Sequence, residues 1–152
     1  MRVRALNSET PSACPYKPPS LITTQTEADH DSSPLPLSLR RTMSRNFLSM
    51  NDELQKGDFL LSNNRKYRAV FQEDGNFVVY GCGPVWASNT CGITDAHRLI
   101  MQEDCNLVIY TPCKPVWSTN TNRSGVKRCR LTLRDDGTLV VENDGAVVWK
   151  ST

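Results

Sequence analysis

A nine-residue pattern that recurs along the chain restricts the possible folds more than any other feature. Residues 72–80 read Gln-Glu-Asp-Gly-Asn-Phe-Val-Val-Tyr, and residues 102–110 read Gln-Glu-Asp-Cys-Asn-Leu-Val-Ile-Tyr. A weaker third copy, Arg-Asp-Asp-Gly-Thr-Leu-Val-Val-Glu, occupies residues 134–142. Each copy is followed by a Val-Trp pair, which ends in Trp86, Trp117 or Trp149. The copies begin at residues 72, 102 and 134. Repeats at a spacing of about thirty residues usually correspond to one supersecondary unit that cannot bury its apolar side alone, so we expect the copies to pack on one another.

The sequence around the copies indicates β-structure. From Asn46 onward, short apolar runs are separated by turn-forming groups such as residues 56–58 (Lys-Gly-Asp) and 62–64 (Ser-Asn-Asn). No window of twelve or more residues shows helical periodicity. We therefore expect an all-β fold, and the threefold repetition favours an arrangement with three faces.

Each of the first two copies contains a turn between apolar strands, which predicts a β-hairpin. A two-residue loop would set Gln72 opposite Phe77 and so place a polar residue against a core residue. A three-residue loop, residues 74–76, pairs Gln72 with Val78 and separates a polar face from a core face. We prefer the three-residue loop, which leaves the apolar residues of the first copy on the core face: Phe71, Phe77 and Val79.

The polar faces offer hydrogen-bonding groups of both kinds. The first carries Gln72, Asp74, Asn76, Val78 and Tyr80, and the second carries Gln102, Asp104, Asn106, Val108 and Tyr110. Amides, a carboxylate and a hydroxyl supply donors and acceptors, and the valine adds a small apolar surface. This set suits a neutral polyhydroxylated ligand. Each face has one carboxylate with no acid partner, so we expect a binding protein and not an enzyme.

The pattern Gln-x-Asp-x-Asn-x-Val-x-Tyr resembles the signature of the monocot mannose-binding lectins, also called bulb-type or B-type lectins. The chain is particularly similar to the fish members of that family, the pufflectin-like skin and mucus lectins. The resemblance covers about residues 45–152 and implies a β-prism II, which is three antiparallel sheets in a pseudo-threefold arrangement. It also implies that the three tryptophans pack at the centre; exposed sugar-stacking platforms are the alternative.

The resemblance assigns a role to each residue of the first copy. Asp74 and Asn76 would hold the mannose 2-hydroxyl, Gln72 the 3-hydroxyl and Tyr80 the 4-hydroxyl, while Val78 would pack on the sugar ring. The second copy would repeat these roles. No metal or other cofactor is expected, because Asp-x-Asn is too short for a calcium loop.

The third copy departs from the pattern at three of five positions. Its residues are Arg134, Asp136, Thr138, Val140 and Glu142, of which only the aspartate and the valine match. Arg134 lies within reach of Asp136 or Glu142 and could fill the position with an ion pair. We expect this copy to keep a structural role and not to bind mannose.

Six cysteines suit a disulfide-bearing extracellular protein: Cys14, Cys82, Cys91, Cys105, Cys113 and Cys129. The resemblance implies a disulfide between Cys105 and Cys129. A second bridge between Cys82 and Cys91, which would leave Cys113 free for an intermolecular bond, remains open.

The N-terminal part differs in composition from the rest. Residues 1–42 hold six of the nine prolines and no Trp or Phe, so they cannot bury enough apolar surface to offset their ordering entropy. We expect a disordered extension there and a lectin domain over residues 43–152. The start of the chain lacks the pattern of a signal peptide, whereas the cysteines favour an extracellular location. The family resemblance implies secretion into mucus; a cytoplasmic location is the alternative.

Charge and hydropathy exclude other classes of function. The net charge of +2 gives no basic field for nucleic-acid binding, and no run reaches the eighteen apolar residues of a membrane span. Residues 122–124 (Asn-Arg-Ser) form a glycosylation sequon that is usable only in the secretory pathway.

These features together predict a calcium-independent mannose-binding agglutinin that recognises terminal mannose on glycans. From the family resemblance, we expect a role in innate mucosal defence and a homodimer that adds avidity to the two sites. The rival hypothesis is a protein-binding or inhibitory module, directed at an integrin or a protease, on the same scaffold.

Overall fold

The computed structural model describes residues 45–152, and these residues form twelve β-strands and no helix. The all-β expectation is therefore confirmed for the described part, and no helix in it could cross a membrane. The extension at residues 1–42 and the domain boundary at residue 43 lie outside the described residues. The strands are β1 (Phe47–Ser49), β2 (Glu53–Gln55), β3 (Phe59–Leu61), β4 (Arg68–Phe71), β5 (Phe77–Tyr80), β6 (Pro84–Ala87), β7 (Arg98–Met101), β8 (Leu107–Tyr110), β9 (Pro115–Ser118), β10 (Cys129–Leu133), β11 (Leu139–Asn143) and β12 (Ala146–Lys150).

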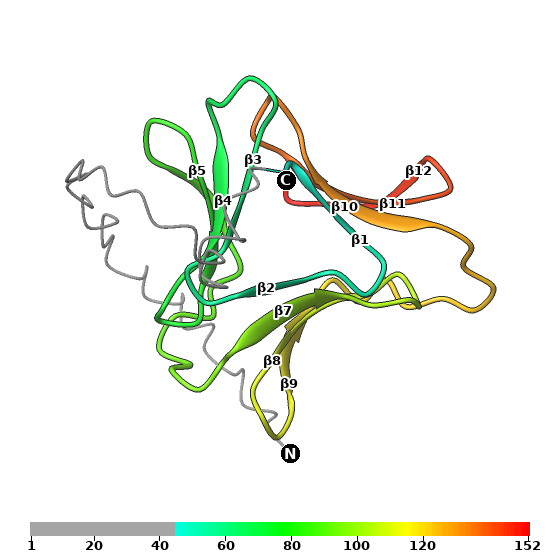
Figure 1. Cartoon of the computed structure of the whole chain (residues 1–152), viewed down its shortest axis with the longest axis horizontal. Coiled ribbons are helices and arrows are strands. Elements are labelled where there is room, and N and C mark those ends of the chain that lie inside the picture. The colour runs from blue at the N-terminus through cyan, green and yellow to red at the C-terminus, as the bar shows by residue number, and fades with distance from the viewer. Residues whose placement is uncertain (1–44) are drawn as a thin grey trace, which may run out of the picture.

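The strands form three antiparallel sheets of four strands each, arranged like the sides of a triangle (Figure 1). The first copy of the pattern lies in the sheet β3-β4-β5-β6, the second in β2-β7-β8-β9 and the third in β1-β10-β11-β12. The expected β-prism II, with three antiparallel sheets in a pseudo-threefold arrangement, is confirmed.

The three shortest strands each complete a different sheet. β1, β2 and β3 follow one another at six-residue intervals and pair with β10, β7 and β4. Their central residues, Leu48, Leu54 and Leu60, are at most 3% exposed and belong to the common core. Because β1 pairs with a strand of the third copy, the described chain closes on itself around that core.

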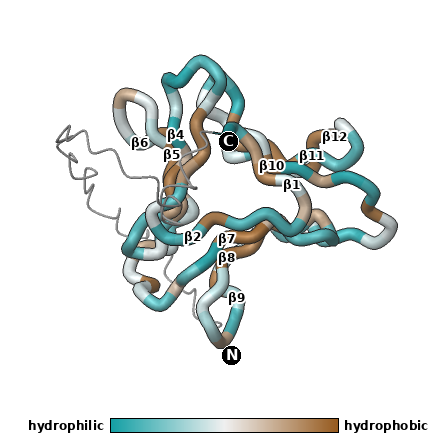
Figure 2. Tube along the Cα trace, in the orientation of Figure 1, coloured by the Kyte–Doolittle hydropathy of each residue, from teal (hydrophilic) through white to brown (hydrophobic). Residues whose placement is uncertain are grey.

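The residues that the three sheets bury against one another are apolar. Figure 2 shows hydrophobic stretches in brown along strands of each sheet. Trp86, Trp117 and Trp149 come from β6, β9 and β12, one from each sheet, and contact one another edge to face with centroids 5.6–6.2 Å apart. Such contacts contribute about 0.5–1.5 kcal/mol each beyond the burial of area. The tryptophans thus pack together against the core, and separate exposed platforms are not formed.

The register of the first hairpin differs from the expected one. The structure pairs Val78 with Val70, and the backbone N–H of Gln72 donates to the carbonyl of Asn76 at 2.8 Å. The loop does have three residues, but they are residues 73–75 and not residues 74–76. The predicted pairing of Gln72 with Val78 is therefore wrong.

The reason lies in the turn chemistry. Gly75 has φ +85° and its N–H donates to the carbonyl of Gln72, as in a type I turn followed by a left-handed residue. The correction moves the pairing by two residues, which preserves the alternation of side chains between the two faces. The predicted faces therefore hold, and the core residues are fully buried: Phe71, Phe77 and Val79.

Each hairpin turn is packed against another part of the chain at its left-handed residue. A Cβ added to Gly75 would lie 2.3 Å from the carbonyl oxygen of Ile93, and one added to Gly137 would lie 2.6 Å from the ring of Tyr67. In the second turn the left-handed residue is Cys105, with φ +74°. Its side chain bonds to that of Cys129 in a disulfide.

The disulfide joins Cys105 to Cys129, with the two Cα atoms 5.4 Å apart, and confirms the expected pair. The suggested bridge between Cys82 and Cys91 is wrong. Cys82 is an exposed free thiol, whereas Cys91 is disulfide-bonded. Cys113 is also exposed and free. The loops between β5 and β6 and between β8 and β9 thus each present one thiol to solvent.

The packing around the first turn leads to a prediction about two glycines with the same φ. Gly145 also has φ +85°, but a Cβ there would meet nothing within 4 Å. We expect Gly145→Ala to lower the free energy of unfolding by about 1–2 kcal/mol through backbone strain alone. Gly75→Ala should lower it by roughly 1–3 kcal/mol more, because its methyl group also collides with backbone. Urea unfolding of both variants measures the difference, and equal losses would contradict the packing explanation.

Candidate functional site

The structure brings the five predicted residues of each of the first two copies to one outward face. In the first sheet, Gln72 follows β4, Asp74 lies in the turn, and Asn76 precedes β5, which carries Val78 and Tyr80. The second sheet arranges the equivalent residues around β8 in the same way: Gln102, Asp104, Asn106, Val108 and Tyr110. We call these groups the first site and the second site.

The glutamine and the tyrosine of each site are hydrogen-bonded to one another. Gln72 Nε2 donates to Tyr80 Oη at 2.6 Å, and Gln102 Nε2 donates to Tyr110 Oη at 2.9 Å. An amide nitrogen can only donate, so the tyrosine oxygen is the acceptor. The bond orients the glutamine with its carbonyl oxygen directed away from the tyrosine.

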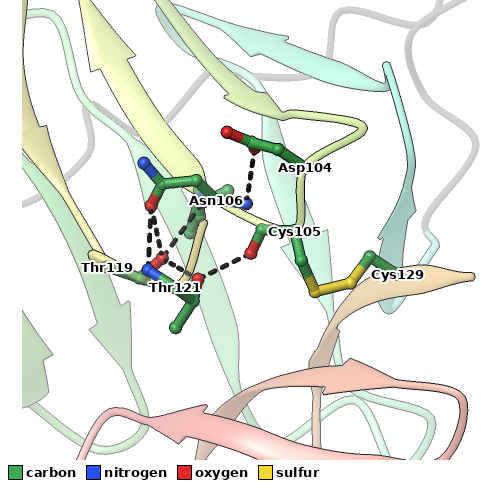
Figure 3. Close-up of a disulfide and its surroundings, with 7 residues drawn as sticks. Asp104, Cys105, Asn106, Thr119, Thr121 and Cys129 are labelled. Carbon is green, nitrogen blue, oxygen red and sulfur yellow. Dashed lines mark hydrogen bonds between the residues drawn. A yellow bond between two sulfur atoms is a disulfide. The ribbon is translucent and has the colours of Figure 1, made fainter. Parts of the chain in front are cut away.

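The asparagine of each site is anchored through its side-chain oxygen. Asn106 Oδ1 accepts from Thr121 N at 3.3 Å and from Thr119 Oγ1 at 3.1 Å (Figure 3). In the first site, Asn76 Oδ1 accepts in the same way from Thr90 N at 3.2 Å and from Ser88 Oγ at 3.0 Å.

These anchors decide which atom the asparagine presents. A backbone N–H can only donate, so the amide oxygen must face Thr90 or Thr121. The amide nitrogen then points away from the anchors, as Figure 3 shows for Asn106. The sequence contains Trp-x-(Ser/Thr)-Asn-Thr segments at residues 86–90 and 117–121, but their supporting role was not predicted. The signal was available, because one such segment follows each complete copy.

The aspartate of each site places an acceptor beside that donor. Asp74 Oδ1 accepts from Asn76 N at 3.0 Å, and Asp104 Oδ1 accepts from Asn106 N at 3.0 Å. These bonds hold the turn with one carboxylate oxygen and leave the other oxygen to the outward face, which Figure 3 shows for Asp104. A donor next to an acceptor matches a hydroxyl group, which both donates and accepts.

The valines of the two sites are almost covered by their own sheets. Val78 is 3% exposed and Val108 is 2% exposed. Their cross-strand neighbours on this face include Val70 and Ile100. The apolar surface that these two positions expose is therefore small, and the groups that the sites could offer a ligand are mostly polar.

The third copy has a different arrangement at the same positions. Arg134 Nη2 lies 2.8 Å from Glu142 Oε1, and this ion pair takes the place of the glutamine–tyrosine pair. The Arg134 side chain is 45% exposed, so the pair contributes about 0–1 kcal/mol to stability. The hydrogen bond from the backbone N–H of Thr138 lowers the pKa of the Asp136 carboxyl below its usual value. Thr138 has no amide group with which to present a donor as Asn76 does.

A hollow of about 520 Å³ lies at the end of the third sheet and not at either site. Its lining includes Arg128, Arg130, Glu142 and Asp144, so its charges are mixed. None of the ten residues of the first and second sites lines it. The hollow is therefore separate from both sites.

Comparison with known proteins connects this geometry with lectins, although no protein-family model matches the chain. The B-type lectin plumieribetin from Scorpaena plumieri is 51% identical over 107 residues, which are 70% of this chain and 94% of that protein. A mannose-specific lectin from Narcissus pseudonarcissus is 44% identical over 68 residues, or 44% of this chain and 61% of that protein.

Solved structures agree with the sequence comparison. A monomeric monocot mannose-binding lectin from Gastrodia elata has a TM-score of 0.63 at 34% identity, over 70% of this chain and 96% of that chain. The snowdrop (Galanthus nivalis) agglutinin, solved with methyl-alpha-D-mannoside, has a TM-score of 0.57 at 35% identity, over 64% of this chain and 88% of that chain. The fish relative is matched over nearly its whole length, and the fold agrees; the chain therefore belongs to the B-type, or bulb-type mannose-binding, lectin family.

Proposed function

We propose that this protein is a calcium-independent lectin that binds terminal mannose at the first and second sites and catalyses no reaction. The observation that carries the proposal is the repeated array of an outward amide nitrogen, an aspartate oxygen and a glutamine–tyrosine pair. Two sheets present this array with hydrogen-bond lengths that differ by at most 0.3 Å between equivalent glutamine–tyrosine pairs (2.6 and 2.9 Å).

The array suits mannose because the sugar carries an axial 2-hydroxyl. In the first site, this hydroxyl would accept from Asn76 Nδ2 and donate to Asp74, while Gln72 and Tyr80 would bind the 3- and 4-hydroxyls. An epimer with an equatorial 2-hydroxyl would leave these protein groups unpaired, at a cost of about 1–3 kcal/mol. The snowdrop agglutinin and a Polygonatum cyrtonema lectin, both similar to this chain, have been solved with mannosides.

Each site alone should be weak. A monosaccharide at a shallow surface is expected to bind with a Kd on the order of 1 mM, or about −4 kcal/mol. Two sites on different sheets allow one chain to join two glycans, and a homodimer would raise the avidity further. We propose that the protein acts as an agglutinin in this way.

The disulfides support an extracellular location for the protein. Cys105 and Cys129 are bonded, and Cys91 is also in a disulfide. Such bonds persist in oxidising compartments and are rare in the cytosol. We propose secretion into mucus and a role in innate mucosal defence, where microbial glycans would be the ligands.

Substitution of both glutamines provides the test of the two sites. We expect the double variant Gln72→Ala plus Gln102→Ala to lose retention on mannose-agarose, because each site loses a contact to the sugar. Arg134→Ala is the matched control, since it alters the equivalent position of the third copy, and it should be retained like the parent chain. If the double variant is retained equally well, mannose binds elsewhere.

The glutamines are better targets than the asparagines. Asn76→Ala and Asn106→Ala would also leave the N–H groups of Thr90 and Thr121 without their acceptor, at a cost of about 1–3 kcal/mol each. We therefore expect this second pair of substitutions to lower the melting temperature as well as the retention. Differential scanning calorimetry of the two double variants separates loss of binding from loss of stability, and an unchanged melting temperature would contradict the anchoring role.

Metal dependence supplies a third test. Within residues 45–152, no group of three or more His, Cys, Asp or Glu side chains could hold a metal ion. We expect retention on mannose-agarose to be the same in excess EDTA and in calcium. A loss of retention in EDTA that calcium restores would overturn the proposed mode of binding.

A further inference from the structure

The connection between β9 and β10 holds a sequon that the mannose sites do not explain. Asn122-Arg123-Ser124 is the only Asn-x-Ser/Thr sequence in the 152 residues. All three residues are exposed and lie outside the strands. Exposure outside a strand is what a modifying enzyme needs to reach an asparagine side chain.

The backbone on either side of Asn122 is hydrogen-bonded to the second site. On one side, Thr121 N donates to Asn106 Oδ1 at 3.3 Å. On the other side, Arg123 N donates to the carbonyl of Asp104 at 2.8 Å. Asn122 is the single residue between these two contacts, so its side chain starts at the rim of the second site.

The first site has the same frame but a different residue at its rim. Thr90 N donates to Asn76 Oδ1 at 3.2 Å, and Gly92 N donates to the carbonyl of Asp74 at 3.0 Å. The residue between these contacts is Cys91, which is disulfide-bonded. The two sites therefore share their recognition residues and differ in what stands beside them.

We propose that Asn122 carries an N-linked oligosaccharide that limits access to the second site and has no counterpart at the first site. This inference rests on the proposed mannose binding for its effect on access, but not for the modification itself. The disulfides of the chain support passage through the oxidising compartment where such transfer occurs.

The transfer is a substitution at the first sugar of a lipid-pyrophosphate-linked oligosaccharide. A bond forms between Asn122 Nδ2 and C1 of that sugar, and the C1–O bond to the pyrophosphate breaks. The lipid pyrophosphate leaves with the electron pair, and Nδ2 loses one proton. The product is a bulky hydrophilic group on Asn122. The neighbours of Asn122 are Thr121 and Arg123, whose backbone N–H groups are hydrogen-bonded to the second site.

The consequence is a change in the number of usable sites. A chain with two accessible sites can join two glycans, whereas a chain with one accessible site can bind only one glycan. Glycosylation at Asn122 would therefore weaken agglutination without altering any residue that contacts the sugar.

The modification is tested first. The full chain is produced behind a secretion signal in eukaryotic cells and treated with peptide-N-glycosidase. We expect one oligosaccharide to be released from the parent chain and none from Asn122→Gln or from Ser124→Ala. Glutamine is used because Ser or Thr at position 122 would create a new sequon at Asn120. A parent chain whose mass equals that of Asn122→Gln before treatment would overturn the proposal.

The effect on access is tested with one site silenced at a time. With Gln72→Ala only the second site remains, and we expect removal of the oligosaccharide to raise retention on mannose-agarose several-fold. With Gln102→Ala only the first site remains, and removal should change nothing. Unchanged retention of the Gln72→Ala chain would refute the shielding. If even the deglycosylated parent is not retained, mannose binding itself fails, and the result for the modification stands separately.

Discussion

The structure depends on the burial of three small sheet faces against one another. Each four-stranded sheet, built of strands of three to five residues, has an apolar face that it cannot bury alone. Leu48, Leu54 and Leu60 supply one buried residue to each sheet from a single leading segment. The tryptophans of β6, β9 and β12 then join the sheets through their rings. No copy of the repeated pattern can therefore be removed without exposing the inner faces of the other two.

This dependence also explains why the site residues are held so firmly. The turn that carries Asp74 and Asn76 is packed against Ile93 and hydrogen-bonded to Thr90, both of which lie in the connection to the next sheet. The same connection that completes the prism thus orients the polar groups of the first site. Ordering of these groups occurs during folding, so a ligand would meet a preformed surface and would not bear that entropy cost.

Much of the fold and of the site follows from the sequence because alternation and repetition are local signals. The faces of the hairpins were predictable from parity, and the closeness of the five site residues followed from the hairpin. The register of the hairpin was not predictable in this way, because the left-handed conformation of Gly75 selects a loop one residue earlier than the polar pattern suggests. The partners of Asn76 were not predicted, although a recurring Ser-Asn-Thr segment marks them, because Ser88 and Thr90 approach Asn76 only after the chain has passed through β5 and β6.

The separation of faces allows the three copies to diverge without loss of the fold. In the third copy the inward residues Leu133, Leu139 and Val141 remain fully buried, while the outward face holds the ion pair of Arg134 and Glu142. The second copy keeps the site residues of the first and differs beside the site, where Asn122 takes the place of Cys91. A substitution on the outward face changes few core contacts, because successive side chains of a strand point to opposite faces. The prism can therefore carry three surfaces with different chemistry on one buried core, and each surface can change independently of the other two.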